Sequence, residues 1–161
     1  GDALQELRNG LLEQQDFGWD TERFVTVLFG QLTPRTGILQ LAAAGHPAPF
    51  VVREESVERP LLVTEAAIGV ELDVALEPYP TEILRLAVGD LVVLFTDGLG
   101  ELRDAEGRLF ETCMAEELAG SRGERAADVV ARLVAAGERF TARPPDDDLA
   151  VLCIGLTALT G

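Results

Sequence analysis

The chain contains 161 residues, of which 28 are acidic and 13 are basic, so its formal charge is −15 at pH 7. This length, with an apolar fraction of 47%, predicts one packed domain of ordinary size. The charge argues against a surface for nucleic acid or anionic membranes, because phosphate groups would be repelled. Every basic residue is an arginine, which excludes chemistry that needs a lysine, such as that of a P-loop or a Schiff base.

The first half of the chain predicts a helix followed by a hairpin. Asp2 is a candidate N-cap for a helix that ends near residues 16–18. Its apolar positions recur at helical spacing, namely Leu4, Leu7, Leu11 and Leu12. β-Branched and aromatic residues predict a buried strand over residues 24–32, and turn residues separate it from a returning strand. The turn lies at residues 33–37, the returning strand at 38–44 and a further strand at 50–53.

The second half predicts another hairpin, two helices and a last strand. Residues 83–86 and 91–95 flank a short turn, and the unbroken apolar run of 91–95 predicts a strand that is covered on both faces. Ser121 and Glu124 form a capping-box pattern, which predicts that a helix begins there. The other predicted elements are a turn at 104–107, a helix at 111–118 ending at Gly120, an apolar helical stripe that reaches Phe140 and stops at 143–145, and a strand at 149–156.

Antiparallel strands covered by helices predict an α+β layered fold, formed as a single domain over residues 1–161. Cys113 and Cys153 lie among apolar neighbours without a Cys/His cluster, so we expect two buried free thiols and no zinc site. Free thiols, the lack of a signal-peptide pattern and the lack of an apolar run long enough to cross a bilayer predict a cytoplasmic location.

Two acidic motifs lie at the ends of predicted strands. Asp97 follows the strand 91–95, and the three aspartates 146–148 precede the strand 149–156. If these strands are antiparallel neighbours, the carboxylates meet at one edge of the sheet. Two negative charges about 4 Å apart repel by roughly 4 kcal/mol at an effective dielectric of about 20. A hard divalent cation such as Mg²⁺, Mn²⁺ or Ca²⁺ would relieve this repulsion.

Each of these motifs also has a purely structural interpretation. The Thr-Asp-Gly sequence at 96–98 is common in Asx-type turns, and three aspartates after two prolines can form a solvated loop or protect the start of a strand. His46, the only histidine, can be a hydrogen-bonded loop residue, and Glu101 and Asp104 can be solvated surface charges. Because no Gly-x-Ser-x-Gly sequence accompanies His46, a Ser–His–Asp triad is not expected.

Taken together and in order, several short segments resemble the SpoIIE/RsbU branch of PP2C-type protein phosphatases. They are residues 24–26 (Phe-Val-Thr), 33–37 (Thr-Pro-Arg-Thr-Gly), 44–49 (Ala-Gly-His-Pro-Ala-Pro), 68–70 (Ile-Gly-Val), 88–91 (Val-Gly-Asp-Leu), 95–101 (Phe-Thr-Asp-Gly-Leu-Gly-Glu) and 146–150 (Asp-Asp-Asp-Leu-Ala). The resemblance covers nearly the whole chain from about residue 4. It implies a PP2C-like α/β/β/α sandwich of two antiparallel sheets flanked by helices, with a two-metal site at one end.

The resemblance also implies roles for particular residues. Asp97 and Gly98 match the family's Thr-Asp-Gly motif, in which the aspartate is a metal ligand. Asp147 matches the aspartate of its last metal-binding motif, with Asp148 as the alternative. These residues would bind Mn²⁺ or Mg²⁺, and a metal-activated water would be the nucleophile, so no side chain is expected to be catalytic in itself.

Further candidates lie beside these ligands. Gly45 and His46 match a family signature that implies a loop near the site or a contact with substrate, and Glu101 follows the Thr-Asp-Gly motif. Gly100 stands where the family often has Thr or Val. The family's upstream Asp-x-x-Gly-x-Gly segment, which bridges both metals, has no counterpart. With no initiator methionine, this predicts that the domain lacks its N-terminal strands and holds only part of the metal site.

The implied activity is hydrolysis of phosphoserine and phosphothreonine in a bacterial stress or sporulation pathway. The implied substrate is the phosphorylated STAS-domain antagonist of an anti-sigma factor, and a homodimer is compatible with this function. The alternative is a catalytically inactive module of the same fold that binds a regulatory partner. The acidic charge and the absence of a basic groove argue against a third hypothesis, that the protein is a carboxylate-metal nuclease.

Overall fold

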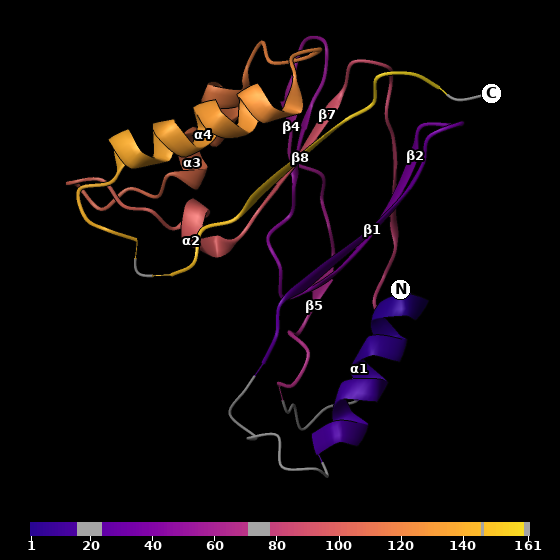
Figure 1. Cartoon of the computed structure of the whole chain (residues 1–161). Coiled ribbons are helices and arrows are strands. Elements are labelled where there is room, and N and C mark those ends of the chain that lie inside the picture. The colour runs from indigo at the N-terminus through magenta and orange to yellow at the C-terminus, as the bar shows by residue number, and fades with distance from the viewer. Residues whose placement is uncertain (16–23, 71–77, 146, 160–161) are drawn as a thin grey trace. The chain divides into compact units, whose positions relative to one another are not determined.

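The computed structural model describes residues 1–15, 24–70, 78–145 and 147–159. They form two compact units (Figure 1). The first unit contains the described residues within 1–33, 38–46 and 61–85, and the second contains those within 34–37, 47–60 and 86–161. Each unit has its own sheet, and the described residues include one helix in the first unit and three in the second. No helix in the described residues is long and apolar enough to span a membrane.

The first unit is built on the hairpin that the sequence predicts. β1 (Val27–Thr33) and β2 (Ile38–Ala44) pair in antiparallel register, from Val27 opposite Ala44 to Thr33 opposite Ile38. β2 also pairs with β6 (Glu82–Arg85) in antiparallel fashion and with β5 (Thr64–Glu65) in a short parallel contact. α1 (Asp2–Gln15) covers the sheet through Leu4. The small core of this unit consists of Leu4, Ala42, Ala44, Ile68 and Tyr79.

β1 differs from the prediction in its burial. The sequence predicts a buried strand over residues 24–32, but Phe24 is 62% exposed, Phe29 is 41% exposed, and the strand begins at Val27. Among the described strands, β1 pairs only with β2, so it forms the edge of this sheet. Its β-branched and aromatic residues favour a pleated backbone whether or not both faces are covered.

The second unit contains the antiparallel sheet β4-β3-β7-β8 and three helices. The strands are β3 (Phe50–Val52), β4 (Val57–Glu58), β7 (Leu91–Phe95) and β8 (Val151–Gly155). The helices are α2 (Asp97–Gly100), α3 (Glu111–Leu118) and α4 (Ala126–Phe140). α3 and α4 lie along the sheet (Figure 1), and Phe110, Met114 and Leu133 share one core with the apolar residues of β7. As the unbroken apolar run predicts, β7 is a central strand that is buried on both faces.

The predicted hairpin of residues 83–86 with 91–95 is wrong. β6 pairs with β2 in the first unit, whereas β7 pairs with β3 on one side and β8 on the other. The segment between them continues the β7–β8 ladder, because the Gly89 N–H donates to the Leu156 carbonyl (2.7 Å) and the Leu156 N–H donates to the Asp90 carbonyl (3.1 Å). With both edges occupied, β7 has no free edge for the strand that precedes it.

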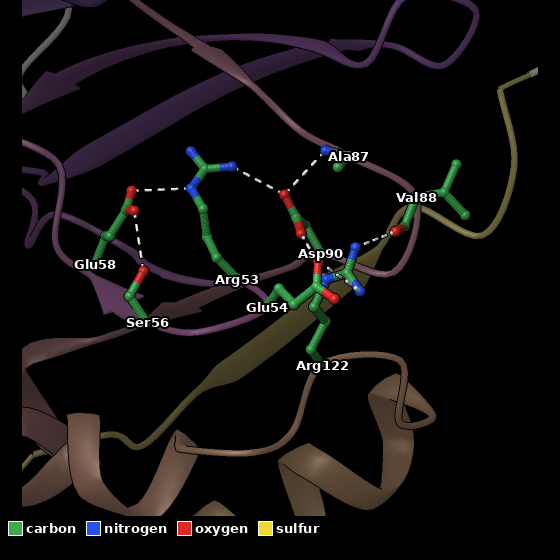
Figure 2. A network of polar contacts seen from close by, with 8 residues as sticks. All are labelled: Arg53, Glu54, Ser56, Glu58, Ala87, Val88, Asp90 and Arg122. Atoms are coloured by element: carbon green, nitrogen blue, oxygen red, sulfur yellow. Dashed lines mark hydrogen bonds and ion pairs between the residues drawn. The ribbon is translucent and has the colours of Figure 1, made fainter.

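Asp90 is the centre of a polar network that fixes this segment (Figure 2). The Asp90 residue is only 2% exposed. Its Oδ2 accepts hydrogen bonds from Arg53 Nη1 and from the Ala87 N–H, each at 2.9 Å, and its Oδ1 accepts one from Arg122 Nε at 3.1 Å. Arg122 also donates to the Val88 carbonyl at 2.8 Å. One buried carboxylate therefore ties the end of β3 and the loop before α4 to the start of β7.

The outer end of this network is exposed to solvent. Arg53 Nε donates to Glu58 Oε2 at 2.9 Å, and Ser56 Oγ donates to Glu58 Oε1 at 3.1 Å (Figure 2). The hydrogen bond from Arg53 lowers the pKa of Glu58 below its ordinary value. Because the Glu58 side chain is half exposed, this ion pair contributes less to stability than the contacts around Asp90.

The predicted capping box at residues 121–124 does not form. α4 begins at Ala126, and the preceding Arg125 makes no side-chain capping hydrogen bond. Ser121 Oγ and Glu124 Oε2 instead accept hydrogen bonds from Arg132, within α4. Ser121 and Glu124 therefore hold the loop before α4 against the side of this helix.

Candidate metal-binding site

Asp97 and Asp147 lie at the same end of neighbouring strands, whereas Asp146 is outside the described residues. β7 and β8 are antiparallel, with Phe95 opposite Val151, so the residues after β7 lie beside those before β8. Thr96 joins the two segments: its N–H donates to the Ala150 carbonyl (3.1 Å), its Oγ1 donates to the Asp148 carbonyl (3.0 Å) and accepts from the Ala150 N–H (2.9 Å). These bonds hold the backbone on both sides of the site in one arrangement.

Gly98 allows the two segments to approach. A Cβ placed on this residue would collide with the Asp148 carbonyl oxygen and would lie 3.1 Å from the Asp147 carbonyl oxygen. Backbone atoms cannot rotate away as a flexible side chain can, so only glycine fits here without displacing the aspartate segment. The close approach of the Asp147–Asp148 backbone thus explains why a glycine follows Asp97.

Asp97 and Asp147 line the same pocket, which has a volume of about 120 Å³. Glu101 also lines it and follows α2, with its N–H donating to the Asp97 carbonyl at 2.7 Å. Asp97 Oδ1 accepts from the Gly98 N–H at 3.0 Å, and Asp147 Oδ1 accepts from the Asp148 N–H at 2.7 Å. Since each hydrogen bond leaves the second carboxylate oxygen available, both side chains retain a donor for a cation.

Asp148 has a different position from Asp147. Its carbonyl oxygen is bound to Thr96, and Asp148 does not line the pocket. Of the two alternatives left by the sequence, Asp147 is the one that lines the pocket, and the identity of the ligand stays a prediction.

The oxygen donors at this site are of the type that Mg²⁺ and Mn²⁺ prefer. In the described ranges, no group of three or more His, Cys, Asp or Glu residues is placed so that it could hold a metal ion. A cation held by Asp97 and Asp147 would therefore need further ligands, and the role of these two residues as metal ligands stays a prediction.

Gly45 and His46 lie in the first unit, immediately after β2. Gly45 has φ +65°, and a Cβ there would lie 2.9 Å from the Ala67 Cβ. Its N–H contacts both the Glu65 carbonyl (2.8 Å) and Thr64 Oγ1 (2.9 Å). The positive φ and these contacts explain why residue 45 is a glycine. The predicted role of His46, near the site or in contact with substrate, stays a prediction.

Two charged residues of the pocket are not among the site residues predicted from the sequence. Arg103 and Arg143 line it together with the three carboxylates. The signal was their position, because Arg103 follows the Thr-Asp-Gly motif closely and Arg143 precedes the Pro-Pro-Asp sequence.

Replacing Gly98 by Ala is expected to lower the free energy of unfolding by about 1–3 kcal/mol, because the added methyl group overpacks the backbone of 147–148. Chemical denaturation measures the change. Gly10→Ala is the matched control, since a Cβ at Gly10 meets no atom within 4 Å. The control lies inside α1 and is expected to be neutral or to gain up to about 1 kcal/mol. Equal stability of the Gly98→Ala protein and the wild type would contradict the close approach.

Comparison with known proteins identifies the family of the chain. The family described as Stage II sporulation protein E (SpoIIE) matches residues 1–157. Protein IcfG of Synechocystis is 25% identical over 91 residues, which are 56% of this chain and 14% of that protein. The chain thus spans a small part of this relative's length.

Solved structures show the same fold. The RsbU and RsbW domains of a Mycobacterium tuberculosis protein align with a TM-score of 0.68 at 22% identity, over 99% of this chain and 49% of theirs. The phosphatase domain of the cell fate determinant SpoIIE from Bacillus subtilis aligns with a TM-score of 0.66 at 16% identity, over 96% of this chain and 75% of that domain. The catalytic domain of the serine/threonine protein phosphatase PstP, in complex with 2 manganese ions, aligns with a TM-score of 0.64 at 15% identity, over 91% of this chain and 65% of that chain.

The described helices and antiparallel strands, with the one short parallel contact of β5, agree with the α+β fold of these phosphatases. With a match over nearly its whole length, the chain belongs to the SpoIIE family of PP2C-type phosphatase domains.

Proposed function

We propose that the protein is a metal-dependent serine/threonine protein phosphatase that uses Asp97 and Asp147 as metal ligands. The observation that carries this proposal is that both carboxylates line one pocket at the end of the β7–β8 pair. Membership of the SpoIIE family supports the reaction class. The PstP structure with 2 manganese ions supports the choice of Mn²⁺ as the cation to test.

The residues of the pocket support a division of roles. Asp97 and Asp147 would hold the cation, and the described residues that line the pocket include no serine, cysteine or histidine. When bound, such a cation makes water a better nucleophile and neutralises charge on the phosphate group. The side chains of the pocket would then only have to bind the cation and orient the phosphate group.

We further propose that the substrate is a phosphorylated STAS-domain antagonist of an anti-sigma factor, and that the reaction takes place in the cytoplasm. The support for this assignment is the resemblance to the RsbU branch and the alignment with a chain that contains RsbU and RsbW domains. A homodimer is compatible with the proposed function.

One observation favours a second candidate function, an inactive phosphatase fold that binds a regulatory partner. Although three carboxylates line the pocket, the described residues contain no group of three or more potential ligands that is placed to hold a metal ion. An inactive module would need no complete metal site.

The two candidates differ in their response to metal. We expect the protein to hydrolyse a phosphoserine peptide in the presence of millimolar Mn²⁺, to lose this activity with EDTA and to regain it when Mn²⁺ is restored. Release of inorganic phosphate measures the reaction. Absence of hydrolysis by folded protein at saturating Mn²⁺ would favour the inactive module.

A further inference from the structure

The pocket beside Asp97 contains charges of both signs. Asp97, Glu101 and Asp147 line it together with Arg103 and Arg143. In the described part of the chain, neither of these guanidinium groups forms an ion pair with a carboxylate. Arg103 uses one donor, Nη1, for the Gly107 carbonyl at 3.2 Å. Two arginines therefore line an acidic pocket without being neutralised by its acids.

The backbone holds the two arginines close to each other. Arg103 follows α2, and Arg143 lies in the loop after α4. The Ala142 N–H donates to the Arg103 carbonyl at 3.1 Å, which joins these segments. Thr141 Oγ1 donates to the Arg143 carbonyl (2.6 Å) and accepts from the Arg143 N–H (3.3 Å). The loop that carries Arg143 is thus fixed at the edge of the pocket.

Guanidinium groups and carboxylates attract different parts of a metal–phosphate complex. Carboxylate oxygens bind the hard cation, whereas the planar guanidinium donates two parallel hydrogen bonds to phosphate oxygens. A phosphate dianion alone would be repelled by Asp97, Glu101 and Asp147. Positive charge is therefore needed before the anion can enter this pocket, and the two arginines add to the charge that a bound cation would supply.

We propose that Arg103 and Arg143 bind the phosphate group of the substrate beside the carboxylates of the candidate metal site. This inference rests on the proposed phosphatase function for the identity of the ligand. Thr141, which also lines the pocket, holds the backbone of Arg143 through the two hydrogen bonds described above.

Binding of inorganic phosphate in the presence of Mn²⁺, measured by isothermal titration calorimetry, tests the pair without relying on catalysis. Arg143→Ala is expected to weaken phosphate binding about tenfold or more, since it removes charge-assisted hydrogen bonds. Arg143→Lys is expected to lose less, because it keeps the charge but not the planar donor pair. Arg103→Lys is expected to weaken binding in the same way, and lysine retains a donor for the Gly107 carbonyl.

Arg125→Ala is the matched control, because this arginine side chain is 82% exposed and does not line the pocket. It is expected to bind phosphate as the wild type does. Mn²⁺ affinity, titrated separately, is expected to be retained in every variant, which shows that the site is still folded. Unchanged phosphate affinity in Arg143→Ala and Arg103→Lys, lost Mn²⁺ affinity in either variant, or no phosphate binding by the wild type would overturn the proposal.

The same variants separate this inference from the proposed function. If phosphate binding depends on the two arginines but the protein does not hydrolyse phosphoserine peptides, phosphate binding by Arg103 and Arg143 is supported and the phosphatase function is refuted. If both arginine variants hydrolyse the peptide with an unchanged KM, the phosphatase function is supported and phosphate binding by Arg103 and Arg143 is refuted.

Discussion

Replacing Asp97 by Asn is expected to reduce Mn²⁺-dependent phosphatase activity by about 100-fold or more. Loss of a residue that only supports a metal ligand already costs about 10–100-fold, and Asp97 is proposed as a ligand itself. The amide keeps the shape of the side chain but removes its negative charge, so the fold is expected to be retained. Hydrolysis of a phosphoserine peptide at several Mn²⁺ concentrations measures the loss.

Three other aspartates provide one parallel test and two controls for this experiment. Asp147→Asn is expected to behave like Asp97→Asn, because both side chains line the pocket. Asp148→Asn and Asp128→Asn are expected to keep most of the activity, since Asp148 contacts the site through its backbone and Asp128 lies on α4. Activity that survives in Asp97→Asn would reject this residue as a ligand.

The largest loss of stability is expected for Asp90→Ala. This change removes the acceptor of three hydrogen bonds, from Arg53, Ala87 and Arg122, at a residue that is 2% exposed. We expect the free energy of unfolding to fall by about 3 kcal/mol, because one partner of a buried network is removed while the donors remain. The two arginine side chains are 27% and 29% exposed, so water can solvate them in part and limit the loss.

Glu54→Ala is the control for Asp90→Ala, and urea denaturation compares the two. The Glu54 side chain is 80% exposed and lies 3.9 Å from Arg122, so its removal is expected to change stability by less than about 0.5 kcal/mol. A similar small change in Asp90→Ala would show that the network does not fix the segment before β7.

Local patterns predicted the elements whose partners are close in the chain. The turn at residues 33–37 brings β1 and β2 together, and the strand over 38–44 has the expected bounds. α3 likewise has the predicted bounds, residues 111–118. The apolar run of β7 correctly indicated burial on both faces, because a strand with no polar alternation has no face suited to water.

The wrong predictions depend on contacts that a local pattern does not contain. Residues 83–86 and 91–95 looked like a hairpin, but β7 is already paired on both edges by β3 and β8. Ser121 and Glu124 had the spacing of a capping box, but both side chains bind Arg132 instead. In both cases a partner distant in the sequence provides the interaction that decides the structure.

The candidate site was predicted in its acidic half only. The positions of Asp97 and Asp147 at strand ends could be deduced, and the neighbouring strands β7 and β8 bring them to one pocket. Their role as ligands stays a prediction. Arg103 and Arg143 could not be placed beside them, because their proximity depends on a loop contact between Ala142 and Arg103.

Diffraction from crystals soaked in Mn²⁺, collected near the manganese absorption edge, tests most directly whether Asp97 and Asp147 share a cation. We predict an anomalous peak within coordination distance, about 2.0–2.6 Å, of a carboxylate oxygen from each residue. A peak bound to only one of them, or bound elsewhere while this pocket is empty, would contradict the account.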